Sequence, residues 1–313
     1  KMRDVPTSPK VTEDSMDSLE GNVGQLLALR VKLMHKVGFL VGCLGNLRAD
    51  GKLSAGANPC ATPTYRMAQY VVVNTPSKKT MYGKQIRRCF IPDKGHDFVG
   101  YDGAGLELRM FAHYINNEAY TEVVLNGDIH SYNQSLAGLP TRDDAKTFIY
   151  AFLYGAGDAK IGSIIGGNAT DGKAIKDKFF RELPELQRLI DSTTKEASRG
   201  YLLGLDGRRL TMRKGRDGKV QTHKALNLKL QGAGALIMKY AMIILDKDVT
   251  KLGLRAHKVL DIHDEGQWTC HKEDTTKLVA CMDTCVKRAG EFFNMNIPLA
   301  SDAMVGKNWY ETH

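Results

Sequence analysis

Two aspartates follow short apolar runs, and their carboxylates could hold hard cations. Residues 98–101 form an apolar run that leads into Asp102, and residues 258–270 fold an apolar run around a polar tip that contains Asp264. Each pattern predicts a buried strand with a carboxylate at its end. If the strands are neighbours, the carboxylates meet and need counter-cations. Oxygen ligands with open positions favour Mg²⁺, and two such ions roughly 3.5–4 Å apart are the usual clamp for displacement at phosphorus.

Residues 141–157 predict one helix that could bind a nucleoside triphosphate. Thr141 with Asp144 three positions on resembles a capping box, and Gly155 is a typical stop. Two cations lie in the N-terminal half of this helix and two tyrosines in its C-terminal half, all at steps of four, so they share one stripe. One end suits a polyanion and the other a flat ring; the alternative is a solvated charge pair followed by core aromatics. The four residues are Arg142, Lys146, Tyr150 and Tyr154.

Composition is that of an ordinary globular protein with a basic balance. The 313 residues are 42% hydrophobic and carry a formal net charge of +9, which is compatible with a nucleic-acid partner but is weak evidence alone. The six cysteines lack CxxC spacing, which favours reduced thiols over a disulfide frame or zinc site. Cations interrupt the apolar residues 26–44, so we expect no membrane span and a cytoplasmic location. Because the chain starts with Lys1, we expect a fragment, a processed product or part of something longer.

The periodicity predicts further elements around these residues. Apolar residues at steps of three and four predict a helix at 26–44, and residues 1–20 are expected to be an extended lead-in. Residues 45–95 are expected to form loops and small strands with a basic surface. Asp206-Gly207 predicts a hairpin turn within 201–212. Further helices are predicted at 106–115, 121–125, 173–199 with a break near Pro184, 222–250 and 274–293.

Three segments together resemble the motifs of a known family. DGAGLELR at 102–109, RDDAKTFIYAFLYGAG at 142–157 and IHDE at 262–265 resemble motifs A, B and C of family A, DNA polymerase I-like, DNA polymerases. LNGDIH, LPTRD, GLDGR, HKALNLKLQGAGALI and GKNWYETH resemble the bacteriophage replicative branch. The resemblance runs nearly continuously from about residue 48 to the C-terminus. One such motif could arise by chance, whereas all three with their intervening blocks could not reasonably do so.

The resemblance implies an α+β fold shaped as a right hand, with an antiparallel palm sheet, helical fingers and the thumb mostly absent. It implies template-directed addition of dNTPs to a primer 3′ end through two Mg²⁺ ions, for which Mn²⁺ can substitute. Asp102, Asp264 and the Gly103 carbonyl would hold the metals, with Glu265 as a supporting acid. Glu107 would be the steric gate that excludes ribonucleotides. The nucleotide contacts implied are Arg142, Lys146 and His130 for the triphosphate, Tyr150 for sugar and base, and Tyr154 for the templating side.

The resemblance also implies DNA contacts. The family's T-G-R segment ahead of motif A is matched here by Thr64-Tyr65-Arg66, with a following segment shorter than usual, so Arg66 would contact the primer end in the minor groove. The acceptors there do not depend strongly on sequence. A tyrosine at position 150 is associated with easy acceptance of dideoxynucleotides. The other implied minor-groove residues are His223, Asn227, Gln231 and His263.

The implied division of the chain is a thumb remnant or lead-in helix at 1–47, palm at 48–120, fingers at 121–200 and palm again at 201–313. No exonuclease is expected within these residues, so the expected partners are primer–template DNA, dNTPs and a separate exonuclease or thumb chain or a processivity factor. Two alternatives remain open. One is a single-subunit RNA polymerase, against which Glu107 and the His-Asp-Glu tip argue. The other is a non-catalytic DNA-binding subunit of polymerase shape.

Overall fold

The computed structural model describes residues 21–312 and divides the chain into two compact units. Of the described residues, 21–57 and 69–90 form the first unit, and 58–68 and 91–312 form the second. The lead-in expected at 1–20 lies outside the described residues. The two-residue strands β1 (Ala57–Asn58) and β2 (Ala68–Gln69) mark the two places where the chain first passes between the units.

The first unit is built on α2 (Gly21–Leu44) and the short α3 (Gly83–Arg88). The helix expected at 26–44 is confirmed and begins five residues earlier. Its apolar stripe is not covered by its own unit: Leu26 and Leu44 are each 66% exposed, and Ala28 is the one buried residue of α2. The unit therefore draws little of its stability from this stripe.

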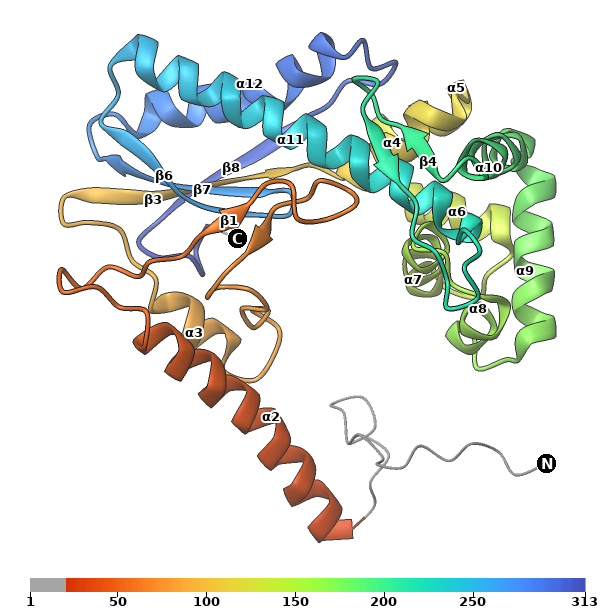
Figure 1. The fold of residues 1–313 in the computed structure, drawn as a ribbon, viewed down its shortest axis with the longest axis horizontal. Helices are drawn as coiled ribbons and strands as arrows, with labels where there is room; N and C mark the ends of the chain where they lie inside the picture. The colour runs from red at the N-terminus through yellow and green to blue at the C-terminus, as the bar shows by residue number, and fades with distance from the viewer. Residues whose placement is uncertain (1–20, 313) are drawn as a thin grey trace. The chain divides into compact units, whose positions relative to one another are not determined.

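The second unit contains a four-stranded antiparallel sheet in the order β6-β7-β3-β8. The strand expected to end at Asp102 is β3. The apolar run, polar tip and apolar return expected at 258–270 form the hairpin of β6 and β7, and β7 is the direct neighbour of β3. Helices α11 and α12 pack together and cross one face of this sheet (Figure 1). The bounds are β3 His96–Gly103, β6 Ala256–Ile262, β7 Glu265–His271, β8 Ser301–Gly306, α11 Ala225–Leu252 and α12 Thr275–Phe292.

A group of helices precedes α11 in the chain and gathers at its N-terminal end (Figure 1). The predicted helix break is confirmed, since α9 ends at Glu182 and α10 begins at Pro184, where proline suits the first helical position. Helix α6 was not predicted, because its apolar residues are few and Ser and Asn interrupt them. The bounds are α4 Leu106–Ile115, α5 Glu118–Asn126, α6 Ile129–Ala137, α7 Arg142–Leu153, α8 Asp158–Ile164, α9 Ala169–Glu182 and α10 Pro184–Ala197.

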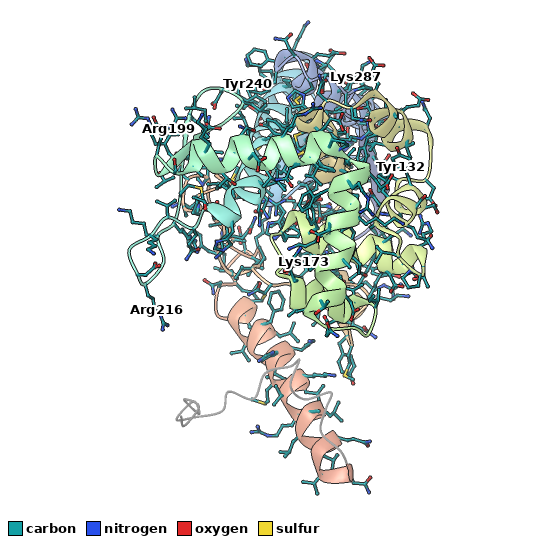
Figure 2. The ribbon with its side chains drawn as sticks, turned by 90° about the vertical axis from the view of Figure 1, so that its right-hand side faces the viewer. Tyr132, Lys173, Arg199, Arg216, Tyr240 and Lys287 are labelled. Carbon is teal, nitrogen blue, oxygen red and sulfur yellow. The ribbon has the colours of Figure 1, made fainter. Side chains whose placement is uncertain are left out.

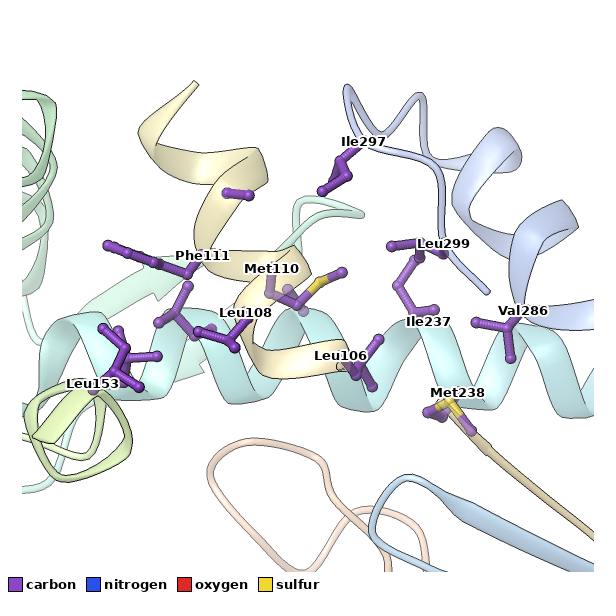
Figure 3. Packing of buried hydrophobic residues seen from close by; sticks show 14 of the residues in the cluster. Leu106, Leu108, Met110, Phe111, Leu153, Ile237, Met238, Val286, Ile297 and Leu299 are labelled. Atoms are coloured by element: carbon purple, nitrogen blue, oxygen red, sulfur yellow. The ribbon is translucent and has the colours of Figure 1, made fainter. Parts of the chain in front are cut away.

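The core of the second unit forms where α4 packs on α11 (Figure 3). The small residues of α11 admit large neighbours: a Cβ on Gly234 would lie 3.3 Å from the Leu106 side chain, and one on Gly232 would lie 2.8 Å from Leu210. The space beside these glycines is therefore filled by side chains of neighbouring elements. The α4–α11 contact fixes the end of β3, because α4 begins three residues after β3 ends.

By length and composition alone, the segment Thr222–Leu252 (α11 with the 3₁₀ turn η1, Thr222–Lys224) could cross a membrane. Of its most apolar window, 61% is buried inside the protein, so its hydrophobicity is that of a core helix. This helix, rather than residues 26–44, is therefore the candidate span among the described residues.

Two hairpins stand between α10 and α11. The predicted one is confirmed: β4 (Tyr201–Leu203) pairs with β5 (Arg209–Thr211), and Gly207 takes the positive φ of 78° that the turn requires. The second, which was not predicted, pairs Lys214 with Val220. Figure 2 shows Arg216 at the tip of a loop that extends away from the helices.

Candidate active site

The strand register brings the predicted acids together. Asp102 on β3 is paired with Glu265 on β7, and Asp264 is the residue immediately before Glu265. The Gly103 amide donates a hydrogen bond to the Asp264 carbonyl, with an N–O distance of 3.1 Å. The two aspartates therefore lie at adjoining positions of neighbouring strands, although 161 residues separate them in the sequence. On its other side Asp102 is paired with Asp302 of β8, an acid that sequence reasoning missed.

The turn that carries Asp264 is strained. His263 and Asp264 form a two-residue connection between β6 and β7, and His263 has a φ of +54°. Residues other than glycine seldom adopt this left-handed conformation, although histidine does so more often than most, and such residues cluster at functional sites. The turn places Asp264 at the end of the sheet, next to the end of β3.

Electrostatics at this end of the sheet favour a cation. Burial raises the pKa of Asp264 above its usual value, and the negative charge of Glu107 raises it further, while Arg66 and His263 lower it. Among residues 21–312 no cluster of three or more His, Cys, Asp and Glu side chains could hold a metal alone. The two carboxylates of Asp102 and Asp264 would suit Mg²⁺, which is usually bound through one or two carboxylates together with substrate phosphates.

The Glu265 side chain is hydrogen-bonded to a residue near the C-terminus. It is 6% exposed, and its Oε1 accepts hydrogen bonds from Trp309 Nε1 at 2.6 Å and Gln267 Nε2 at 2.5 Å. The Gln267 amide also donates to the Thr312 carbonyl. These residues pack over Gly100, where a Cβ would lie 2.5 Å from the Thr312 carbonyl oxygen. A role for Glu265 at the metals stays a prediction, while its buried hydrogen bonds fix the strand that follows Asp264.

Replacing Trp309 by Phe should destabilise the fold, because Glu265 would lose a hydrogen-bond donor in a buried site. We expect the free energy of unfolding to fall by about 1–3 kcal/mol more than the loss of ring volume alone requires. Trp268→Phe is the matched control, since Trp268 is also buried but its Nε1 has no hydrogen-bond partner among the described residues. Denaturant unfolding of both variants measures the difference, and equal losses would contradict a role for this bond.

The helix predicted at 141–157 is confirmed as α7. Thr141 caps it by accepting a hydrogen bond from the Asp144 amide, and the Thr141 hydroxyl donates to the Asp144 carboxylate. The reciprocal capping-box bond to the Thr141 amide does not form. At the other end Gly155 has a φ of +80°, and the Ala156 amide bonds back to the Ala151 carbonyl. Tyr154 therefore caps the helix rather than lying within it.

The N-terminal end of the stripe forms a cationic cluster. Arg142 makes two hydrogen bonds to Asp128, at 2.6 and 3.0 Å, and these hold the pKa of Asp128 well below its usual range. Asp128 also caps α6, the helix that begins beside His130. Burial and the charges of Arg142 and Lys146 lower the pKa of His130, whose Nδ1 is buried without a hydrogen-bond partner among the described residues. Lys146 makes no ion pair in the described part of the chain, so an anion here would find unused donors.

The C-terminal end of the stripe faces the acids. Burial, then the charges of Glu107 and Asp264, raises the pKa of Tyr150. The Tyr154 hydroxyl donates to Glu107 Oε1 at 2.9 Å, and Arg66 pairs with the same oxygen at 3.3 Å. Helix α7 therefore runs from a cationic end to the end of the sheet near Glu107 and Asp264.

The segment that was matched to T-G-R keeps the conformation a glycine would favour. Tyr65 has a φ of +57°, and the Arg208 guanidinium lies 5.0 Å from the centre of its ring. The cation on the ring helps to hold this strained tyrosine. Arg66 is thereby placed beside Glu107.

A groove of about 420 Å³ in the second unit collects most of the predicted DNA contacts. Arg66, Asn227, Gln231 and His263 all line it, and His223 does not, although His223 is exposed on η1 immediately before α11. Sequence reasoning missed several lining residues, and two of them, Arg213 and Gln221, lie in a polar stretch without apolar periodicity. The missed polar residues of the lining are Thr62, Thr64, Thr211, Arg213, Gln221 and Lys224.

The fold that positions these residues is that of polymerase domains. The structure of the "POL domain of Pol1 from M. smegmatis complex with DNA primer-template and dNTP" superposes with a TM-score of 0.88. The match covers 100% of this chain and 58% of that one, at 24% sequence identity. The mixed fold with an antiparallel sheet expected from the sequence is confirmed.

The chain belongs to DNA polymerase family A, whose family model matches residues 21–311. It is 42% identical to a DNA-directed DNA polymerase of Escherichia phage Phieco32, over 98% of this chain and 64% of that protein. It is 36% and 35% identical to the DNA-directed DNA polymerases of Enterobacteria phage T3 and Escherichia phage T7, over 84% of this chain and 42% of each. The chain thus spans between two-fifths and two-thirds of the length of these phage relatives.

Proposed function

We propose that the chain catalyses template-directed addition of dNTPs to a primer 3′ end. The observation that carries the proposal is the placement of α7. The cations at its N-terminal end lie near His130, and the tyrosines at its C-terminal end lie near Glu107 and Asp264. The distribution matches a triphosphate lying along the stripe with its α-phosphorus at the acids. Family membership supports the same activity, as do the printed names of the phage relatives.

Asp102, Asp264 and the Gly103 carbonyl would hold two Mg²⁺ ions, which activate the primer hydroxyl and neutralise the triphosphate when bound. Arg142, Lys146 and His130 would stabilise the charge that develops on the leaving pyrophosphate. Tyr150 would stack beside the sugar and base. Glu107, held by Tyr154 and Arg66, would crowd the sugar 2′ position.

Primer–template DNA would occupy the groove lined by Arg66, Asn227, Gln231 and His263. In this assignment the sheet and its helices α11 and α12 are the palm, and helices α5 to α10 are the fingers. Residues 21–44 would belong to a thumb remnant. For a phage-encoded chain the reaction would take place in the host cytoplasm. A separate exonuclease, thumb chain or processivity factor is a further proposed partner.

Primer extension by the purified chain on a defined template tests the proposal. We expect incorporation of the complementary dNTP, abolished by EDTA and restored by Mg²⁺ or Mn²⁺. Replacing dNTPs by NTPs should suppress incorporation, because Glu107 excludes the 2′-hydroxyl. Preferential use of NTPs would favour an RNA polymerase, and DNA binding without extension under any metal would favour a non-catalytic subunit.

A further inference from the structure

The hairpin of residues 213–221, named here the basic hairpin, carries charge that the fold does not neutralise. Its backbone is held by hydrogen bonds from the Gly215 amide to the Lys219 carbonyl and from the Gln221 amide to the Arg213 carbonyl. Four exposed cations lie on it, and Asp217 is its one acid. The Asp217 carboxylate accepts a hydrogen bond from the Lys219 amide and so belongs to the turn. The cations are Arg213, Lys214, Arg216 and Lys219.

Arg208 and Arg209, which precede the basic hairpin, have partners, whereas the four cations of the hairpin make no ion pair among residues 21–312. Arg208 pairs with Asp206 at 2.6 Å, and the Arg209 guanidinium lies 4.7 Å from the centre of the Tyr201 ring. No ion pair joins any of the four hairpin cations to an acid among residues 21–312. A local excess of unpaired arginine and lysine is the electrostatic footprint of a polyanion site. A merely solvated loop is the alternative that an experiment must exclude.

The position of the basic hairpin identifies the polyanion. Its two ends, Arg213 and Gln221, both line the groove that contains Asn227, Gln231 and His263, and Lys224 follows in the same wall. The hairpin therefore rises from the rim of the groove, and Figure 2 shows Arg216 at the tip of its loop, away from the helices. A duplex lying in the groove would continue past this rim with its phosphates facing the four cations.

We propose that the basic hairpin is a second DNA-binding element, which holds the sugar–phosphate backbone of the primer–template duplex beside the groove. The proposal rests on the proposed function. Phosphate contacts fix the position and register of a duplex without reading its sequence. The hairpin would thus add affinity that depends on salt and not on base identity.

The test is a triple substitution, Lys214→Gln, Arg216→Gln and Lys219→Gln, which leaves Arg213 in the groove wall unchanged. All three residues are exposed, so the fold should persist. We expect duplex affinity to fall on the order of 10-fold at moderate salt. Each lost phosphate contact should reduce the slope of log affinity against log salt by about 0.9, so the triple variant should lose roughly 2–3.

The matched control is Lys247→Gln, Lys251→Gln and Lys277→Gln, which removes the same charge. Lys247 and Lys251 lie near the C-terminal end of α11, a helix that spans about 42 Å at 1.5 Å per residue. This control should change affinity and slope much less. Equal effects of the two triple variants would show a response to net charge alone and overturn the proposal, as would an unchanged slope in the hairpin variant.

Affinity for a blunt duplex and for a duplex with a single-stranded template overhang separates contacts to the duplex from contacts to the single-stranded template. We expect the same loss of affinity on both, and a loss confined to the overhang substrate would overturn the assignment to duplex. At saturating DNA the hairpin variant should extend primers at the normal rate. If the unaltered chain never extends primers while the hairpin variant still loses duplex affinity, the proposed function fails and the hairpin site stands.

Discussion

Asp264→Asn should abolish nucleotide incorporation while the protein remains folded and bound to DNA. The substitution keeps the shape of the side chain and removes its negative charge. The site already disfavours that charge, since burial and Glu107 raise the pKa of Asp264. It removes one of two carboxylates proposed to hold the metal ions. We expect a loss on the order of 10³-fold in the single-turnover rate, equivalent to about 4 kcal/mol of transition-state stabilisation.

Single-turnover primer extension and DNA binding measure the two halves of this expectation. Asp283→Asn is the control, because it removes the same charge from an exposed site on α12. DNA affinity of Asp264→Asn should be equal to or tighter than that of the unaltered chain, since a negative charge has been removed near a polyanion. Normal extension by Asp264→Asn would reject both the metal site and the proposed function.

Lys146→Ala should lower kcat/KM for the incoming dNTP by about 10²–10³-fold. Lys146 lies one turn from Arg142, and its ammonium is free to meet a phosphate, whereas Arg142 already engages Asp128. The charge on the leaving pyrophosphate grows in the transition state, so the loss should appear in kcat as well as in KM.

Lys160→Ala on the neighbouring helix α8 is the matched control, since Lys160 is also exposed and makes no ion pair in the described part of the chain. Lys146→Arg should recover part of the activity, because the charge returns in a different geometry. A Lys146→Ala variant that binds DNA less well but uses bound dNTP normally would contradict the assignment.

Local patterns in the sequence predicted the elements of the site well. The apolar runs around Asp102 and Asp264, the Thr141 cap and the Gly155 stop all had signals that act within a few residues, and the structure has each one. Helix α6 was missed because its N-cap at Asp128 was not followed by a regular apolar stripe. The basic hairpin was missed for a similar reason, since glycines and charges there have no period.

Contacts between residues far apart in the sequence could not be predicted, because no local pattern indicates them. The Trp309–Glu265 bond spans 44 residues, and the Arg66–Glu107 pair depends on a tyrosine held at positive φ. A buried carboxylate and an exposed one look alike in a sequence, so the hydrogen bonds of Glu265 to Trp309 and Gln267 could not be predicted. Only the packing of residues 308–312 over Gly100 shows which way it is directed.

The single oxygen of Glu107 that serves both Arg66 and Tyr154 has an evolutionary consequence. Arg66 and Tyr154, from separate parts of the chain, share one acceptor on Glu107. The effect of changing any of these three residues therefore depends on which residues occupy the other two positions. A substitution at any of these positions would therefore change both sugar selection and alignment of the primer end, and combined substitutions should show strong epistasis.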